Sequence, residues 1–164
     1  MCQVQDSFLE EKYFNTIKKT LTSSNFPWYY QPSLTSFKEN QDSCYMAHIF
    51  YRDGKVNSEW ISILDPLFKA LNVSKLINIR ANLTLKGQNA FSNFHEDDED
   101  NKEDHPTSIF YVNTNNGYTH MKKDNQKVYC VENRLLTFNH KELHKVVGQS
   151  DENQRIILNL NYYI

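Results

Sequence analysis

The amino-acid sequence predicts a mainly β protein, a jelly roll buttressed by helices near its N-terminus. Many short runs of strand-forming residues follow Lys75, and turn signals separate them at near-regular spacing, a pattern typical of β sandwiches and barrels. Two segments with helical periodicity lie ahead of these runs. The chain of 164 residues shows no internal repeat and no linker, so we expect residues 1–164 to form one domain around a single core.

The two expected helices differ in how clearly their limits are marked. The first runs from Phe8 to Leu21, and Ser7 is expected to cap it because Glu10, three residues later, completes a capping box. The second runs from Glu59 to Leu71 and presents a broad apolar face. Pro66 lies inside this second pattern, so two short helices are an alternative to one longer helix.

The longest expected strand, from Leu76 to Leu85, alternates between two kinds of side chain. Apolar residues occupy one face, and the other face carries Asn78, Arg80, Asn82 and Thr84. This polar row would line a pocket inside a barrel or face solvent, and the alternation is compatible with both. The other expected strands are Tyr45–Tyr51, Ser108–Val112, Thr119–Met121, Lys127–Val131, Arg134–Phe138, Lys145–Val147 and Arg155–Tyr162.

Composition and charge exclude several classes of protein. The formal net charge is -2, so the chain has no global basic field to attract nucleic acid. Cys2, Cys44 and Cys130 are widely spaced and form no CxxC pair, which favours reduced thiols. The N-terminus lacks the pattern of a secretory signal, and no apolar run approaches the roughly twenty residues that span a membrane. We therefore expect a cytoplasmic protein with neither a nucleic-acid nor a membrane partner.

The stretch that bears on chemistry is Phe94-His95-Glu96-Asp97. Residues two apart on an extended chain point to the same side, so His95 and Asp97 can reach a common point. His144 can bring a second imidazole from a later strand. Two histidines and a carboxylate on one face of an ion are the site of non-haem Fe(II) oxygenases. We therefore expect these three residues to bind iron, with no catalytic residue beyond the metal ligands.

Several neighbouring residues compete with this assignment. The acidic residues from Asp98 to Asp104 are interpreted as a solvated loop, because only Asp97 has the spacing of two residues from His95. His140 is the rival of His144, whereas His105 is expected on the surface. A Ca²⁺ site built from the acidic residues is an alternative, although the DxDxDG spacing is missing.

Arg155 begins the final expected strand, where a basic residue at a sheet edge would be unremarkable. A guanidinium makes bidentate bonds to a carboxylate, and a buried one needs an anionic partner. Bound 2-oxoglutarate would provide that anion. Its keto-acid end would chelate the iron, and its distal carboxylate would lie against Arg155.

With these residues in place, the chain resembles the 2-oxoglutarate/Fe(II)-dependent oxygenase superfamily, and within it the small prolyl-4-hydroxylase-like proteins, several of which are carried by phages. The resemblance spans Lys75 to Tyr162. Each motif is short, and their order and separations together make the resemblance specific. The motifs are Ile79-Arg80-Ala81-Asn82-Leu83, Phe94-His95-Glu96-Asp97, Asn133-Arg134-Leu135-Leu136-Thr137-Phe138, Leu143-His144 and Arg155-Ile156-Ile157-Leu158-Asn159-Leu160-Asn161-Tyr162.

The resemblance implies a double-stranded β-helix and a dioxygenase that hydroxylates a substrate with release of succinate and CO2. The implied cofactors are Fe(II), 2-oxoglutarate as cosubstrate and O2, with ascorbate as reductant. A peptide hydroxylated at proline is the family-level expectation for the primary substrate, and a small molecule is the alternative. The aromatic stretch from Phe26 to Tyr30 would then supply a groove wall, although core packing explains it as well. A phage-encoded member would work in the host cytoplasm.

The resemblance also implies a set of cosubstrate-binding residues. Some members of the superfamily place a serine two residues after the arginine, where this chain has Ile157, so another hydroxyl is expected to replace it. The residues expected to bind the cosubstrate are Arg155, Asn82, Arg80, Tyr111 and Thr119.

Two functions of other classes fit the strand pattern. A non-enzymatic jelly roll, lectin-like or a virion structural module, does not require the joint placement of His95, Asp97, His144 and Arg155. A cupin-type isomerase or metal-binding protein with Zn²⁺ or Mn²⁺ would need neither dioxygen nor a keto acid, and would have no use for Arg155.

Overall fold

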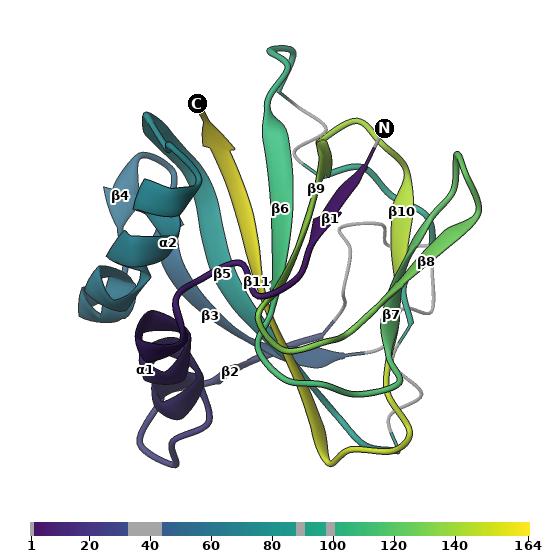
Figure 1. Cartoon of the computed structure of the whole chain (residues 1–164), viewed down its shortest axis with the longest axis horizontal. Coiled ribbons are helices and arrows are strands. Elements are labelled where there is room, and N and C mark those ends of the chain that lie inside the picture. The colour runs from purple at the N-terminus through teal and green to yellow at the C-terminus, as the bar shows by residue number, and fades with distance from the viewer. Residues whose placement is uncertain (1, 33–43, 88–90, 98–100) are drawn as a thin grey trace.

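The fold was analysed in a computed structural model, which describes residues 2–32, 44–87, 91–97 and 101–164. Two antiparallel sheets face each other, and the helices lie on the outer side of the larger sheet (Figure 1). This is the jelly roll that the sequence predicts. The polar stretch from Gln31 to Ser43, which is typical of a loop, falls mostly outside the described residues, as do Asp98 to Asp100 of the acidic run.

The larger sheet contains most of the strands. Their spatial order is β1 (Gln3–Gln5), β9 (Arg134–Asn139), β6 (Pro106–Tyr111), β11 (Gln154–Tyr163), β5 (Lys75–Leu85), β3 (Tyr45–Arg52) and β2 (Tyr29–Gln31), and β4 (Lys55–Val56) also pairs with β3. The smaller sheet has the order β10 (His144–Val147), β7 (Tyr118–Met121) and β8 (Gln126–Tyr129). Every strand predicted from the sequence is present, and the short strands β1, β2 and β4 are additions.

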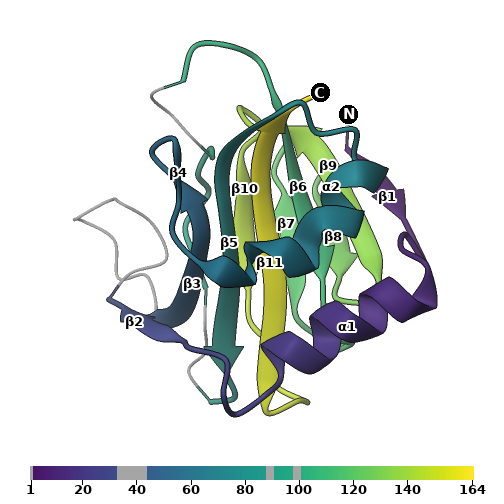
Figure 2. The same ribbon diagram turned by 90° about the vertical axis from the view of Figure 1, so that its left-hand side faces the viewer.

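Three helical segments cover the outer face of the larger sheet (Figure 2): α1 (Glu11–Leu21), the 3-10 helix η1 (Glu59–Leu64) and α2 (Asp65–Ala70). The break that Pro66 allows is present, because Pro66 lies in the first turn of α2, where its missing N–H costs no hydrogen bond. Ser58 caps η1 by accepting a hydrogen bond from the backbone N–H of Trp60. None of the described helices is long and apolar enough to cross a membrane.

The start of the first helix corrects the sequence prediction. Ser7 has a φ of 51° and does not cap the helix, which begins at Glu11 rather than Phe8. Asn133 holds the preceding residues instead: its side chain accepts from the N–H of Leu9 and donates to the carbonyl of Leu9, and its own carbonyl accepts from the N–H of Phe8. A tertiary contact therefore replaces the capping box.

The register of β5 shows where its polar row points. Ile79, Ala81 and Leu83 belong to the core between the larger sheet and the helices. The intervening residues must face the other way, towards the smaller sheet, because side chains alternate along a strand. Arg80 pairs with Asn159 of β11, and Asn82 pairs with Ile157, so these polar residues lie inside the sandwich.

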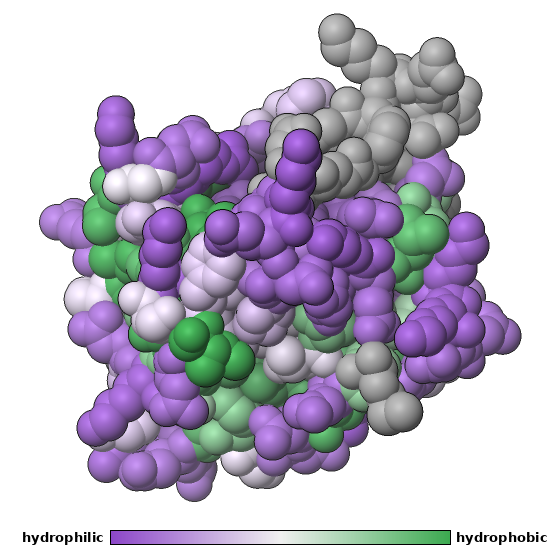
Figure 3. Space-filling model, turned by 90° about the horizontal axis from the view of Figure 1, so that it is seen from above, coloured by the Kyte–Doolittle hydropathy of each residue, from purple (hydrophilic) through white to green (hydrophobic). Residues whose placement is uncertain are grey.

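The interior between the two sheets is divided into an apolar and a polar part. The apolar part joins β6, β9 and β11 to the smaller sheet through Ile109, Tyr111, Met121, Val128, Cys130, Leu136, Phe138 and Ile157. The polar part lies against β5 and the adjacent half of β11. Seen from above, the molecule is mostly hydrophilic, with small separate hydrophobic areas (Figure 3). The candidate site is in the polar part of the interior.

Candidate metal centre and cosubstrate pocket

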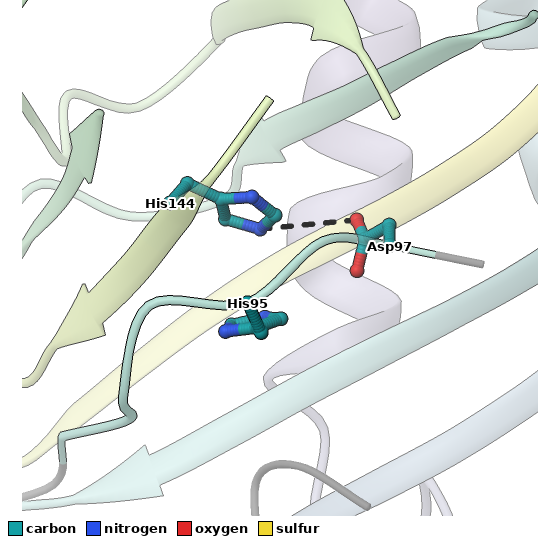
Figure 4. A group of neighbouring side chains, drawn as sticks. All are labelled: His95, Asp97 and His144. Atoms are coloured by element: carbon teal, nitrogen blue, oxygen red, sulfur yellow. Dashed lines mark ion pairs between the residues drawn. The ribbon is translucent and has the colours of Figure 1, made fainter. Parts of the chain in front are cut away.

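His95, Asp97 and His144 converge, as the sequence predicts (Figure 4). One ligand atom from each lies within 4.8 Å of the other two, and His144 Nε2 is 3.9 Å from Asp97 Oδ2. His95 forms an isolated antiparallel bridge with His144, which begins β10, so backbone pairing brings the two imidazoles together. Among the described residues, this is the one cluster of three or more His, Cys, Asp or Glu side chains that could hold an ion.

Backbone carbonyls fix the tautomers of both histidines. His95 Nδ1 is 2.9 Å from the carbonyl oxygen of Asn93, and His144 Nδ1 is 3.0 Å from that of Glu142. A carbonyl oxygen can only accept, so each Nδ1 carries the proton and donates it. In the neutral form of each imidazole the lone pair is then on Nε2, the atom that would bind a metal.

The electrostatics of the site favour the protonation states that a metal needs. Burial raises the pKa of Asp97, but the charges of His144, Arg80 and His95 and a hydrogen bond from Asn159 outweigh burial and hold that pKa below its usual range. Burial lowers the pKa of His144, more strongly than the Asp97 carboxylate raises it. At neutral pH the carboxylate is ionised and the His144 imidazole is neutral, as metal ligation requires.

A chain of hydrogen bonds orients the Asp97 carboxylate from behind. Thr107 Oγ1 donates to Asn161 Oδ1 at 2.5 Å, Asn161 Nδ2 donates to Asn159 Oδ1 at 3.2 Å, and Asn159 Nδ2 donates to Asp97 Oδ2 at 3.0 Å. The direction of the chain is set by its end, because an ionised carboxylate only accepts. These three residues were not predicted from the sequence. The final strand could have indicated them, because it places two asparagines at alternate positions on the face of Arg155, among mostly apolar residues.

Two further histidines lie behind Asp97: one bonds its backbone, and the other stacks on the first. His140 is fully buried, and its Nδ1 donates to the Asp97 carbonyl while its own carbonyl accepts from the Asp97 N–H. His140 is therefore a neighbour of the site and not the second imidazole. His105 was expected on the surface, and this was wrong: it is 3% exposed and stacks on His140 with ring centroids 3.9 Å apart. The turn before β6 folds inward, which the charged local sequence did not indicate.

Arg155 is buried at the opposite end of the polar interior, with 1% of its surface exposed. Its Nε donates to Cys130 Sγ at 3.1 Å, and its enclosed Nη2 has no hydrogen-bond partner among the described residues. Arg155 also forms no ion pair with any carboxylate among the described residues. Gly117 packs against the stem of the arginine, and a Cβ there would come within 2.9 Å of Arg155 Cδ. A buried guanidinium with a vacant donor favours an anionic partner, and none of the described residues supplies one.

The two hydroxyls expected to replace the missing serine are close to Ile157. Tyr111 pairs with Ile157 across β6 and β11, and its hydroxyl donates to Thr119 Oγ1 at 2.8 Å. Burial raises the pKa of Tyr111 far above its usual value, so it remains a neutral phenol. Because Thr119 accepts from Tyr111, its own hydroxyl proton is available to another acceptor. Asn82 lies on the other side of Ile157, and its enclosed Oδ1 has no partner among the described residues.

The donor set fits a ferrous ion. Two neutral imidazoles and one carboxylate are the ligands of the facial triad, which leaves other positions of the ion open. Bonds of about 2.1 Å at right angles would place the ligand atoms about 3 Å apart, so binding requires the Asp97 and His144 atoms to approach each other by about 1 Å. Side-chain rotations can supply a movement of that size.

Comparisons with known proteins identify the class of fold. No family model and no curated protein matches the chain. Among solved structures, a viral collagen prolyl hydroxylase of Paramecium Bursaria Chlorella virus-1, in its 2OG complex, has a TM-score of 0.66 and 13% identity, covering 98% of this chain and 94% of that one. A Trichoplax adhaerens prolyl hydroxylase in complex with a hypoxia inducible factor fragment has a TM-score of 0.74 and 11% identity over 99% and 83%.

A Pseudomonas putida prolyl-4-hydroxylase has a TM-score of 0.67 and 15% identity, covering 99% of this chain and 92% of that one. The fold of this protein is therefore the double-stranded β-helix of the 2-oxoglutarate/Fe(II) oxygenases, and prolyl hydroxylases are among the proteins that share it. At these identities the likeness shows the fold alone, and activity depends on the residues of the site.

Proposed function

We propose that this protein is an Fe(II)- and 2-oxoglutarate-dependent dioxygenase that hydroxylates its substrate with release of succinate and CO2. The observation that carries the proposal is the joint presence of the His95, Asp97 and His144 cluster and a buried Arg155 that has no anionic partner among the described residues. A fold of this class explains neither feature by itself. Both are explained if an ion and a dicarboxylate occupy the polar interior.

Each residue has a defined task in this proposal. His95, Asp97 and His144 would hold the iron, and the bound iron and 2-oxoglutarate would supply the oxidative chemistry. Arg155 would bind the distal carboxylate of the cosubstrate through its vacant Nη2. Thr119 would donate its free hydroxyl proton to the same carboxylate, in place of the serine that Ile157 replaces.

Around these residues the chain controls orientation and access to water. Cys130 holds one side of the Arg155 guanidinium, which leaves the other side directed at the cosubstrate. Burial of Arg155 and Thr119 excludes water from the closed end of the pocket, and this strengthens charge-assisted hydrogen bonds there. Ascorbate would act only as the reductant of the iron.

The structural neighbours and one cavity support a peptide as the primary substrate. The Trichoplax adhaerens neighbour is a complex with a peptide fragment. In this protein a cavity of about 630 Å³ lies along β2 and β3, and Pro27, Tyr29 and Trp60 contribute to its lining. Tyr29 and Trp60 are exposed, so aromatic faces are available to a proline-containing segment. A small molecule is the alternative substrate, and oligomerisation is not required by this geometry.

The proposal is tested by binding before it is tested by turnover. Titration of 2-oxoglutarate into the Mn(II)-loaded protein without oxygen should give saturable binding at one site, and His144→Ala should abolish it. Succinate release with Fe(II), ascorbate and oxygen should then exceed that of His144→Ala. A protein that binds Mn(II) but ignores 2-oxoglutarate would favour the cupin-type alternative, in which Arg155 has no partner.

A further inference from the structure

Arg80 is a second arginine in the polar interior, and the proposed chemistry leaves its charge without a partner. It lies in the middle of β5, opposite Asn159 of β11 and Ile49 of β3. Asn159 contacts Asp97, so Arg80 is at the level of the metal centre, and its positive charge contributes to the lowered pKa of Asp97. Its enclosed Nε has no hydrogen-bond partner, and it forms no ion pair within the described part of the chain.

The solvent exposure of the polar side chains on β5 increases from one end of the row to the other. Thr84, opposite Arg155, is 1% exposed, and Asn82 is 9% exposed. Arg80 and Asn78, further along the strand, are half-buried. A ligand entering from solvent therefore meets Arg80 before it reaches the buried end of the pocket. The cosubstrate would fill the closed end, and the primary substrate would occupy the open one.

A count of the charges in the proposed site shows that one positive charge has no anionic partner. A ferrous ion with its Asp97 ligand carries one net positive charge, and Arg80 and Arg155 add two more. A 2-oxoglutarate dianion neutralises two of the three. One positive charge then remains in a partly dehydrated site, where an unpaired charge is unfavourable. The half-buried Arg80 is the group that is left without an anion.

We propose that Arg80 binds a carboxylate of the primary substrate, so that the substrate is an anionic molecule, such as an amino acid or a peptide whose carboxylate lies near the oxidised carbon. The proposal rests on the proposed function and adds the substrate class. Ile49 and Ala47 of β3 pair with Arg80 and Asn82, so their side chains share the face on which Arg80 would meet the substrate.

The same residue could instead meet the carboxylate of 2-oxoglutarate that lies beside its keto group. The two sources differ in one measurable respect. A substrate carboxylate binds in addition to 2-oxoglutarate, whereas a cosubstrate carboxylate is already in place once 2-oxoglutarate is bound. A simple carboxylate added to the cosubstrate-loaded protein therefore distinguishes them.

The experiment uses acetate as the probe and acetamide as its neutral counterpart. Each is titrated by calorimetry, without oxygen, into the full chain loaded with Mn(II) and saturating 2-oxoglutarate. Wild type should bind acetate and not acetamide. Arg80→Met should weaken acetate binding about 10-fold or more, because one charge-assisted contact is lost, while Arg80→Lys should retain most of it. Lys75→Met, at the exposed start of the same strand, is the matched control and should behave as wild type.

The outcomes separate this proposal from the one on which it rests. Absence of 2-oxoglutarate binding by wild type would overturn both. Normal 2-oxoglutarate binding with no acetate binding, or with equal acetate binding in wild type and Arg80→Met, would overturn the substrate assignment alone. A loss of 2-oxoglutarate affinity in Arg80→Met as large as that in Arg155→Met would assign the contact to the cosubstrate and also refute it. Thermal unfolding of each variant shows whether the fold is retained.

Discussion

Replacing Arg155 with methionine should affect cosubstrate binding and stability in opposite directions. Methionine keeps an unbranched stem against Gly117 and removes the guanidinium. In the empty protein that guanidinium has a vacant, enclosed donor, and one unsatisfied buried polar group costs about 1–3 kcal/mol. The variant loses one hydrogen bond, from Nε to Cys130 Sγ, which a neutral thiol accepts only weakly. We therefore expect the free energy of unfolding to stay the same or rise by up to about 2 kcal/mol.

The cosubstrate should respond far more strongly. Truncating one partner of a buried, hydrogen-bonded charge pair costs about 2–5 kcal/mol, which corresponds to a loss of affinity between about 30-fold and several thousand-fold. Urea unfolding of the metal-free protein measures the first quantity, and calorimetric titration of 2-oxoglutarate into the Mn(II)-loaded protein measures the second.

Arg52→Met is a suitable control, because Arg52 ends β3, where it pairs with Lys55 of β4, far along the sheet from the pairing of Arg155 with Thr84. It should leave 2-oxoglutarate affinity unchanged and alter stability by at most about 1 kcal/mol. A strongly destabilised Arg155→Met that still binds 2-oxoglutarate normally would refute the reasoning, since Arg155 would then be a structural residue.

The remaining predictions concern the metal centre and the N-terminal segment. Asn159→Leu should weaken Mn(II) binding about 10- to 100-fold in calorimetry, because it removes the hydrogen bond that orients the Asp97 carboxylate. Thr107→Val should have a smaller effect in the same direction. If both variants bind Mn(II) as tightly as wild type, the hydrogen-bond chain does not orient the ligand. Stability in urea should fall as the pH drops through the ordinary histidine range, because the unfolded chain takes up a proton that buried His144 resists, and it should fall further as the lowered pKa of Asp97 is passed. His144→Phe should shrink the first phase and also weaken the second, because the His144 charge is the main cause of the lowered pKa of Asp97. Asn133→Ala should lower the free energy of unfolding by about 1–3 kcal/mol, because it removes two hydrogen bonds to Leu9 and strains a residue with a φ of 59°. Asn133→Gly also removes the hydrogen bonds but avoids the strain, so its stability should lie between those of wild type and Asn133→Ala. An unchanged unfolding midpoint for Asn133→Ala would contradict this account.

Local pattern was sufficient for the longer strands and for the expectation that His95 and Asp97 lie together. Alternation from Leu76 to Leu85 predicted β5 and its two faces, because a strand buried on one side by helices must present every second residue to them. The spacing of His95 and Asp97 predicted that both would reach one point, and the structure brings His144 to the same place. The alternation in β5 and the spacing of His95 and Asp97 each span a few residues, so chain connectivity preserves them, whereas His144 comes from a strand far along the chain.

Whether a polar row faces solvent or a pocket is not a local property. Arg80 and Asn82 would alternate with apolar neighbours in either case, and only the position of the smaller sheet places them inside. The same limit explains the error at His105, which sits among charged residues along the chain and against His140 in space. It also explains the start of α1, where Asn133, distant in sequence, replaces the local cap.

The sequence by itself therefore determined the main strand pattern, and it singled out His95, Asp97, His144 and Arg155 as candidates for the site. The tertiary structure alone decided which of the other polar residues surround them: Asn159, Asn161 and Thr107 behind Asp97, and Cys130 beside Arg155. The physical reason is that burial and hydrogen-bond partnership depend on distances between chain segments far apart in sequence, and side-chain alternation within one segment carries no information about the segment it will face.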